Sequence, residues 1–151
     1  MNKRLGILLI PVVAAGLVVG CGGGDEPMEP APPAVTPPPD LSGTYTLVSL
    51  TGAITGGLTV GPPAVMGTFT LSQGAPTGDT ASGMLSLSIS APALQFMLED
   101  QGTFTIRADG SWEQRAETGQ AVGTFTLAGN VLTVVVTEPA TAASTTVWQR
   151  Q

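Results

Sequence analysis

The sequence predicts an all-β domain, a small antiparallel up-and-down barrel of about eight strands, preceded by a disordered, proline-rich tether. Three observations lead to this fold class. A short phrase of alternating threonine and apolar residues recurs between residues 41 and 151. No stretch of that region has helical periodicity. Short turns separate the copies, and a meander of this size removes its exposed edges by closing into a barrel.

The recurring phrase reads Gly-Thr-aromatic-Thr-aliphatic. It stands at residues 43–47, 67–71, 102–106 and 123–127, with a looser copy at 83–87. Alternation at period two gives each strand one dry face and one wet face, and threonine suits the wet one. The copies are too unevenly spaced for a solenoid, so hairpins whose loops differ in length explain them better.

The expected strands follow from this pattern and from the turn signals between the copies. They lie at residues 43–50, 66–73, 82–90, 94–106 with a break, 111–117 and 144–150, with a hairpin over residues 121–137. Residues 51–65 are rich in glycine and proline and are expected to form a long loop. Joined mostly by short turns, these segments make an antiparallel meander in sequence order.

The Asp109-Gly110 pair allows two turns. A two-residue turn would put Glu113 and Arg115 on the same face as Phe104. A three-residue loop with Gly110 in the left-handed conformation shifts the register by one residue. Burying two charges beside Phe104 would cost several kcal/mol unless they were paired, so the three-residue loop is favoured. One face then consists of Phe104, Ile106, Trp112, Gln114 and Ala116.

The second turn that can be read closely is Gly129-Asn130. A two-residue turn there puts the apolar side chains of both strands on one face and the threonines on the other. A three-residue turn would instead oppose Phe125 with Thr133. We therefore expect the two-residue turn, with a dry face made of Phe125, Leu127, Leu132, Val134 and Val136.

The N-terminal segment has the pattern of an export signal. Lys3 and Arg4 precede an apolar run of fifteen residues, which is too short to span a bilayer comfortably. Gly20 then leads into Cys21, the only cysteine of the chain. Without this context, a lone cysteine after an apolar run would be interpreted as a small buried hydrophobe.

Val18-Val19-Gly20-Cys21 resembles the lipobox of bacterial lipoproteins. The resemblance implies that a signal peptidase cuts before the cysteine and that its thiol carries a diacylglyceryl group, which anchors the protein in a membrane. The domains expected on this basis are a signal peptide at residues 1–20, a lipidated tether at residues 21–40 and the barrel at residues 41–151.

The tether is expected to be disordered. Three glycines follow the cysteine, and seven prolines stand between Pro27 and Pro39 with no aromatic residue among them. Such a stretch stays extended because it has little to bury. Glycines and acids directly after a lipidated cysteine look like the tethers of outer-membrane or surface-displayed lipoproteins, although a generic linker has the same composition. We expect an anchor in the outer membrane, facing the periplasm or the cell surface.

Composition excludes several functional classes. Without the first twenty residues, three arginines remain against eleven acids, which gives a net charge of −8, and no lysine or histidine is left. Phosphate binding needs clustered cations, so no nucleic-acid partner is expected. Without histidine or a free thiol, neither a nucleophile–base pair nor an ordinary zinc site can be assembled. We expect no catalytic residue, metal or cofactor.

Two acid pairs are the remaining candidates for catalysis. Adjacent strand residues point to opposite faces, so Glu99 and Asp100 are poorly placed for joint acid–base work. Glu113 and Glu117 share a strand face with Arg115 between them, which is typical of a solvated surface. Neither pair therefore predicts an enzyme.

Several segments together resemble a known group. These are the lipobox, the tether, the first strand at residues 43–47, the turn at residues 108–110 and residues 123–132, and they are similar to small bacterial lipocalin-like lipoproteins. The resemblance implies a compact antiparallel barrel, often without an assigned activity. Lipocalins carry Gly-x-Trp in the first strand and an arginine over the tryptophan. Here Tyr45 replaces the tryptophan, and Arg150 either stacks on it as a cation–π pair or frays into solvent.

Two functions remain open. In the first, a lipid-anchored envelope protein binds a small apolar ligand at the barrel mouth. In the second, the barrel is filled, its side chains are ordinary core, and the outer surface or residues 51–65 contact another protein. The interior volume separates the two hypotheses, because an eight-stranded barrel holds either side chains or one small ligand. The candidate ligand-binding residues are Tyr45, Phe69, Phe104, Trp112, Gln114 and Phe125. Gln114 would either orient the ligand or bond to a backbone group.

Overall fold

The computed structural model describes residues 34–151, and Cys21 with the rest of the N-terminal segment lies outside them. Nine strands form one antiparallel sheet. The predicted strands are confirmed, with small differences at their ends. They are β1 (Gly43–Gly52), β2 (Thr59–Val60), β3 (Met66–Gln73), β4 (Thr80–Ala91), β5 (Phe96–Arg107), β6 (Ser111–Ala116), β7 (Gly119–Ala128), β8 (Val131–Glu138) and β9 (Ser144–Arg150).

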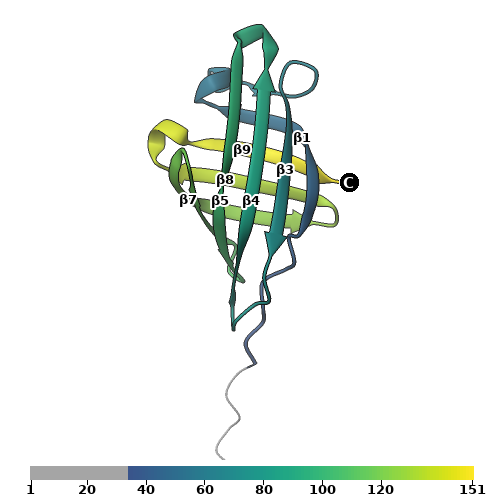
Figure 1. Ribbon diagram of the computed structural model, residues 1–151, viewed down its shortest axis with the longest axis vertical. Coiled ribbons are helices and arrows are strands. Elements are labelled where there is room, and N and C mark those ends of the chain that lie inside the picture. The colour runs from purple at the N-terminus through teal and green to yellow at the C-terminus, as the bar shows by residue number, and fades with distance from the viewer. Residues whose placement is uncertain (1–33) are drawn as a thin grey trace, which may run out of the picture. The chain divides into compact units, whose positions relative to one another are not determined.

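The sheet closes on itself, as predicted. From β3 to β9 each strand pairs with the next one along the chain, and β1 pairs with both β3 and β9 (Figure 1). The β1–β9 ladder runs from the pair Tyr45–Arg150 to the pair Gly52–Ser144, with an irregularity after Leu47. Eight of the nine strands therefore form a barrel without free edges, and β2 adds a short side pairing to the end of β1.

Both predicted turns are confirmed. Gly110 has a left-handed backbone with φ +89°, and β5 pairs with β6 so that Phe104 faces Gln114 and Ile106 faces Trp112. Gly129 is also left-handed, with φ +60°, and the turn it begins opposes Phe125 with Val134. These registers keep the apolar side chains of four consecutive strands on the inner face of the barrel.

Two recurring glycines allow neighbouring strands to approach closely. A Cβ atom built on Gly83 would lie 2.1 Å from the carbonyl oxygen of Ser72, and one on Gly102 would lie 2.1 Å from that of Arg115. Both distances are far below van der Waals contact, so no larger residue fits. Glycine is therefore needed at these two positions of the recurring phrase, where the backbones of neighbouring strands come very close.

Two details of the predicted strands are wrong. Residues 51–65 are not all loop, because β1 continues to Gly52 and a 3₁₀ turn (η1, Ala53–Thr55) returns the chain so that β2 pairs with it. The break expected within residues 94–106 comes earlier, in a 3₁₀ turn (η2, Pro92–Leu94) before β5. Proline fixes the φ angle at the start of that turn, and this local constraint outweighed the apolar pattern.

The end of the predicted tether packs against the barrel. Pro38 is buried, and the Gln73 side chain donates to the Pro39 carbonyl at 3.1 Å and accepts from the Leu41 N–H at 2.9 Å. The expectation of disorder is therefore wrong for Pro38–Asp40. One amide side chain satisfies two backbone groups there, which compensates for the ordering of this short segment.

Tyr45 and Arg150 join the two ends of the domain. Tyr45 is fully buried and donates to the Leu41 carbonyl at 2.8 Å. Arg150 donates to the Tyr45 hydroxyl from Nε at 3.0 Å and from Nη2 at 2.6 Å, and its guanidinium carbon lies 5.2 Å from the ring centroid. The interpretation of Arg150 as a frayed residue is therefore wrong, and the cation–π interpretation is confirmed.

The same guanidinium also reaches the incoming chain. Arg150 Nη2 donates to the Asp40 carbonyl at 2.9 Å. The backbone N–H of Ser42, then its hydroxyl, and to a smaller extent Arg150 hold the pKa of the Asp40 carboxyl below its usual value. The stability that these contacts add is present above the ordinary carboxyl pKa and is lost as the pH falls through the lowered one.

An aromatic cluster fills one half of the barrel interior. Trp112 stacks on Phe104 at 5.3 Å between ring centroids and meets Phe69 and Phe125 edge-on at 6.1 and 6.5 Å. Trp148 lies 5.1 Å from Phe69. All five rings are buried. We call this half the closed end; it holds Leu41, the β5–β6 and β7–β8 turns and the C-terminus.

In the part of the chain that the structure describes, no helix is long and apolar enough to cross a membrane. Three 3₁₀ turns, η1, η2 and η3 (Ala140–Ala142), stand between strands at the barrel end opposite the closed end (Figure 1). They follow β1, β4 and β8, and the β6–β7 turn lies at the same end.

Removing the Tyr45 hydroxyl tests the contact at the closed end. Tyr45→Phe leaves the Leu41 carbonyl without its donor and Arg150 without its acceptor, so we expect the free energy of unfolding to fall by about 1–3 kcal/mol. Urea denaturation followed by tryptophan fluorescence measures it. The control is Thr103→Val, an exposed outer-face change expected to stay within about 0.5 kcal/mol. Equal effects of the two substitutions would contradict the assignment.

Candidate functional site

The other half of the barrel interior is hollow. A cavity of about 300 Å³ lies beyond the aromatic cluster and opens at the end opposite the closed end. Every strand of the barrel contributes to its wall, and η1, η3 and the β6–β7 turn surround its mouth. The volume is at the lower limit of the range typical of small-molecule sites, roughly 300–1,000 Å³.

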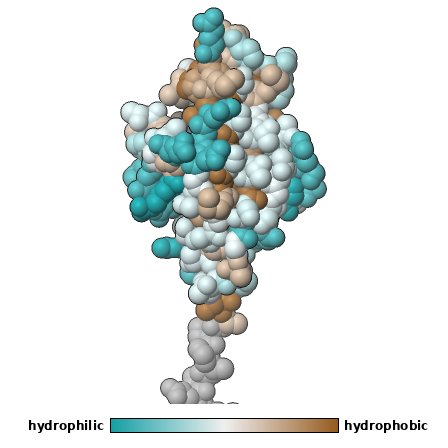
Figure 2. Space-filling model, in the orientation of Figure 1, coloured by the Kyte–Doolittle hydropathy of each residue, from teal (hydrophilic) through white to brown (hydrophobic). Residues whose placement is uncertain are grey.

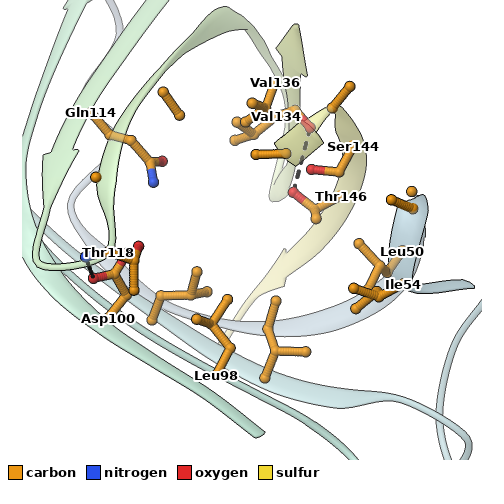
Figure 3. Close-up of a pocket in the computed structure, with 18 of the residues that line it drawn as sticks. Leu50, Ile54, Leu98, Asp100, Gln114, Thr118, Val134, Val136, Ser144 and Thr146 are labelled. Carbon is orange, nitrogen blue, oxygen red and sulfur yellow. Dashed lines mark hydrogen bonds between the residues drawn. The ribbon is translucent and has the colours of Figure 1, made fainter. Parts of the chain in front are cut away.

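Most of the wall is aliphatic. Leu50 and Ile54 line one side, Leu98 another, and Val134 and Val136 a third (Figure 3). Phe69 and Trp148 form the floor, where the cavity meets the aromatic cluster. Binding of an apolar molecule to such a surface is favourable, because apolar area of both is removed from water.

The outer side of this end is also apolar in places. The exposed large hydrophobic residues there come from η1, η2 and the segments beside them, and Figure 2 shows apolar surface gathered at that end of the molecule. They are Ile54, Leu58, Leu94 and Met97. An apolar rim of this kind adjoins the mouth without closing it.

One polar group of the wall is a buried carboxylate. Asp100 on β5 is 3 % exposed and is the only buried charged residue among those described. The Thr118 hydroxyl donates to Oδ2 at 2.5 Å, and the Thr118 backbone N–H donates to Oδ1 at 3.2 Å. Asp100 thereby holds the β6–β7 turn against β5, and the two side chains lie next to each other on the cavity wall (Figure 3).

Gln114 on β6 lies on the same side of the cavity (Figure 3). The Trp112 indole N–H donates to Gln114 Oε1 at 3.1 Å, which fixes the orientation of the amide. Of the two interpretations of Gln114, the backbone partner is wrong, because the partner is a side chain. Its amide nitrogen makes no hydrogen bond to any described residue, so two donors remain for a ligand.

Ser144 and Thr146 on β9 form a second polar group on the opposite wall (Figure 3). The Trp148 indole N–H donates to Thr146 Oγ1 at 2.8 Å, and that hydroxyl donates to the Val134 carbonyl at 3.4 Å. Both tryptophans therefore bond to a polar residue two positions away on their own strand. Thr146 uses its only donor in this way, so on this wall the donor free of such a bond is the Ser144 hydroxyl.

The structure separates the predicted ligand-binding residues into two groups. Phe69 and Gln114 line the cavity. The other four lie outside its wall, in the closed end: Tyr45, Phe104, Trp112 and Phe125. Alternation predicts the inner face of a strand, but it does not tell how far along the barrel axis a residue lies.

Sequence reasoning missed Asp100 and Thr118. Asp100 was considered only as a neighbour of Glu99, and the expectation that the two point to opposite faces is confirmed, since Glu99 is exposed and Asp100 buried. The sequence contains a signal for Asp100: it is separated from Phe104 and Ile106 by an even number of positions on one strand, so all three face the same side of the sheet. A carboxylate in an inward position predicts a polar contact inside the barrel.

The chemistry of the wall is that of binding by shape and hydrogen bonds. Among residues 34–151, no three acidic, thiol or imidazole side chains gather where they could hold a metal ion. The polar side chains of the wall include the Asp100 carboxylate, the Gln114 amide and the Ser144 hydroxyl. They provide both acceptors and donors around an aliphatic space.

Comparison with known proteins adds little. No protein-family model matches the chain, and no curated protein matches it. Among solved structures, it is similar to a de novo designed fluorescence-activating β-barrel, with 14 % sequence identity and a TM-score of 0.47. The match covers 74 % of this chain and 94 % of the designed one.

Replacing Gln114 tests its contact with Trp112. Gln114→Leu keeps the side-chain size but leaves the buried indole N–H without an acceptor, so we expect the free energy of unfolding to fall by about 1–3 kcal/mol. Gln101→Leu, on an exposed position of β5, is the matched control and should change it by less than about 0.5 kcal/mol. Chemical denaturation measures both. An unchanged stability for Gln114→Leu would mean that water replaces the amide.

Proposed function

We propose that this protein is a lipid-anchored protein of the bacterial envelope whose barrel binds a small, largely apolar molecule. The observation that carries the binding function is the cavity of about 300 Å³ with its mainly aliphatic wall. Cores of proteins are normally packed to crystal-like density, so a space of this size at the open end of a barrel favours a ligand.

The alternative hypothesis, an interaction protein with a filled barrel, has less support. It needs side chains throughout the interior, and the aromatic cluster occupies only the closed end. Transfer of a molecule from water into a cavity with an apolar wall is most favourable when the molecule is apolar. The hollow end therefore favours the binding hypothesis.

The architecture leaves the mouth accessible. Pro38–Asp40 join the barrel at the closed end, where Gln73 and Arg150 hold them. Residues 34–42 consequently lie at the end opposite the mouth (Figure 1). A binding protein attached to a surface through its N-terminal segment benefits from this arrangement, because its attachment does not compete with ligand entry.

Binding rather than catalysis is the role that we propose for the cavity. The chain contains no histidine, and its single cysteine lies outside the described residues. Asp100 contacts only Thr118 through its carboxylate oxygens, and Thr118 has no base other than Asp100. A lone carboxylate without a second titratable group beside it supports recognition better than acid–base chemistry.

Ligand uptake can be tested with matched substitutions on β7. Residues 34–151 should bind a neutral apolar dye such as N-phenylnaphthylamine saturably, with enhanced dye fluorescence. Ala121→Phe adds a ring inside the cavity and should weaken binding about tenfold or more. Val122→Phe, its outward-facing neighbour, should leave the affinity within about twofold. Absence of saturable binding by the unaltered protein, or equal loss in both variants, would refute the proposed binding function.

The anchor has its own test. In a bacterial host supplied with labelled palmitate, the full chain should incorporate label and fractionate with membranes, since acyl chains supply about 0.8 kcal/mol per buried methylene. Cys21→Ser should abolish both, and Ser42→Ala serves as a control that leaves them unchanged. Intact-mass spectrometry of the purified protein gives the decisive result. A mass equal to that of the unmodified chain beginning at Met1 would rule the lipid anchor out.

A further inference from the structure

The charge pattern of the cavity points to a more specific ligand, and this inference rests on the proposed binding function. Among residues 34–151, Asp100 is the only charged residue in the cavity wall. Its burial leaves 3 % of its surface exposed, and it lies between aliphatic residues, with Leu98 on the same face of β5 and Leu87 opposite on β4. A carboxylate in such surroundings is costly unless it is paired and hydrogen-bonded.

No side chain of residues 34–151 supplies a counter-charge for Asp100. Within residues 34–151, the one ion pair joins Arg115 to Glu113 on the exposed surface of β6. Arg150 is engaged at the closed end with Tyr45 and Asp40. No cationic side chain lines the cavity. Residues 34–151 thus leave the charge of Asp100 to be balanced by a bound molecule.

The hydrogen bonds of Asp100 are also incomplete. Thr118 supplies two donors, one to each carboxylate oxygen. An ionised carboxylate has about four lone-pair sites, so about two of them remain for a molecule in the cavity. Holding the β6–β7 turn thus uses only part of the acceptor capacity of this side chain. Asp100 belongs to the cavity wall, next to the space that a ligand would occupy.

We infer that the barrel binds a small amphiphilic amine, whose ammonium group pairs with Asp100 and whose hydrocarbon part lies against the aliphatic wall. A protonated amine supplies both the missing charge and the missing donors. A bare metal ion fits less well, because the surrounding wall consists of Leu, Ile and Val rather than of further oxygen ligands. The net charge of the chain, −6, also attracts a cation and repels a fatty acid.

A matched ligand series tests the inference on the full chain in proteoliposomes. Hexylamine, hexanol and hexanoate share one hydrocarbon chain and differ in the head group. Trp148 in the cavity floor and Trp112 are the only tryptophans, so indole fluorescence reports binding and the lipid contributes none. At neutral pH hexylamine should bind about tenfold tighter than hexanol, because a charge-assisted hydrogen bond is roughly twice as strong as a neutral one, and hexanoate should bind weakest.

Two substitutions assign the preference to one residue. Asp100→Asn should bring amine and alcohol within about twofold of each other while hexanol still binds. Asp109→Asn is the matched control: Asp109 also accepts a backbone N–H in a turn, from Ser111 at 2.9 Å, but it lies at the closed end. That variant should keep the wild-type ratio. Far-UV circular dichroism checks that both variants are folded.

The outcomes separate the inference from the function on which it rests. If unaltered protein binds hexanol and hexylamine equally, or prefers hexanoate, the amine inference is overturned and the apolar-ligand function stands. If none of the three compounds binds, the proposed function itself fails. If Asp100→Asn does not fold, the ligand series on the unaltered protein still decides, and a retained amine preference in folded Asp100→Asn overturns the role of Asp100.

Discussion

The ladder between β1 and β9 is the constraint on which the rest of this structure depends. It joins the first strand of the domain to the last and removes the two edges that a meander would expose. The Arg150–Tyr45 contact lies at the start of this ladder and connects it to the incoming chain through Leu41 and Asp40. Without closure the inner face would be one side of an open sheet, and neither a packed half nor a hollow half could exist. The barrel thus turns a repeated two-faced strand into an enclosed volume.

The distribution of side-chain sizes inside that volume divides it into a core and a cavity. At the closed end, three buried phenylalanine rings pack around Trp112, and Trp148 packs on one of them, Phe69. At the open end the inward positions hold smaller residues such as Ala121, Val134 and Val136, which do not reach across the interior. The packed core and the cavity therefore occupy different halves of one barrel. The two tryptophans connect the halves: the indole N–H of Trp112 bonds to Gln114 and that of Trp148 bonds to Thr146, and both partners also line the cavity. The polar wall is held in place by the core beneath it.

Asp100 both holds a turn of the barrel and lines the cavity. Its contact with Thr118 fixes the β6–β7 turn at the mouth, and among residues 34–151 no cationic side chain shares the cavity wall with it. Asp109 caps the β5–β6 turn in a similar way at the exposed closed end, where the Ser111 hydroxyl, then its backbone N–H, and weakly Arg107 lower the pKa of its carboxyl. The two turns differ in what surrounds the carboxylate, which is water at Asp109 and aliphatic wall at Asp100.

The sequence by itself determined the strands, their faces and two of the turns, because period-two alternation and left-handed glycines act over a few residues. Gly110 and Gly129 set the register of their hairpins, and the register told which side chains share a face. Only the tertiary structure decided how deep each inward residue lies, since depth depends on the tilt and stagger of strands around the closed barrel. For this reason Phe69 and Gln114 were placed at the cavity by the fold, Tyr45, Phe104, Trp112 and Phe125 were placed in the core, and Asp100 became the charged residue of the site. The contact between Arg150 and Tyr45 likewise joins residues from opposite ends of the domain, and no local pattern encodes such a meeting.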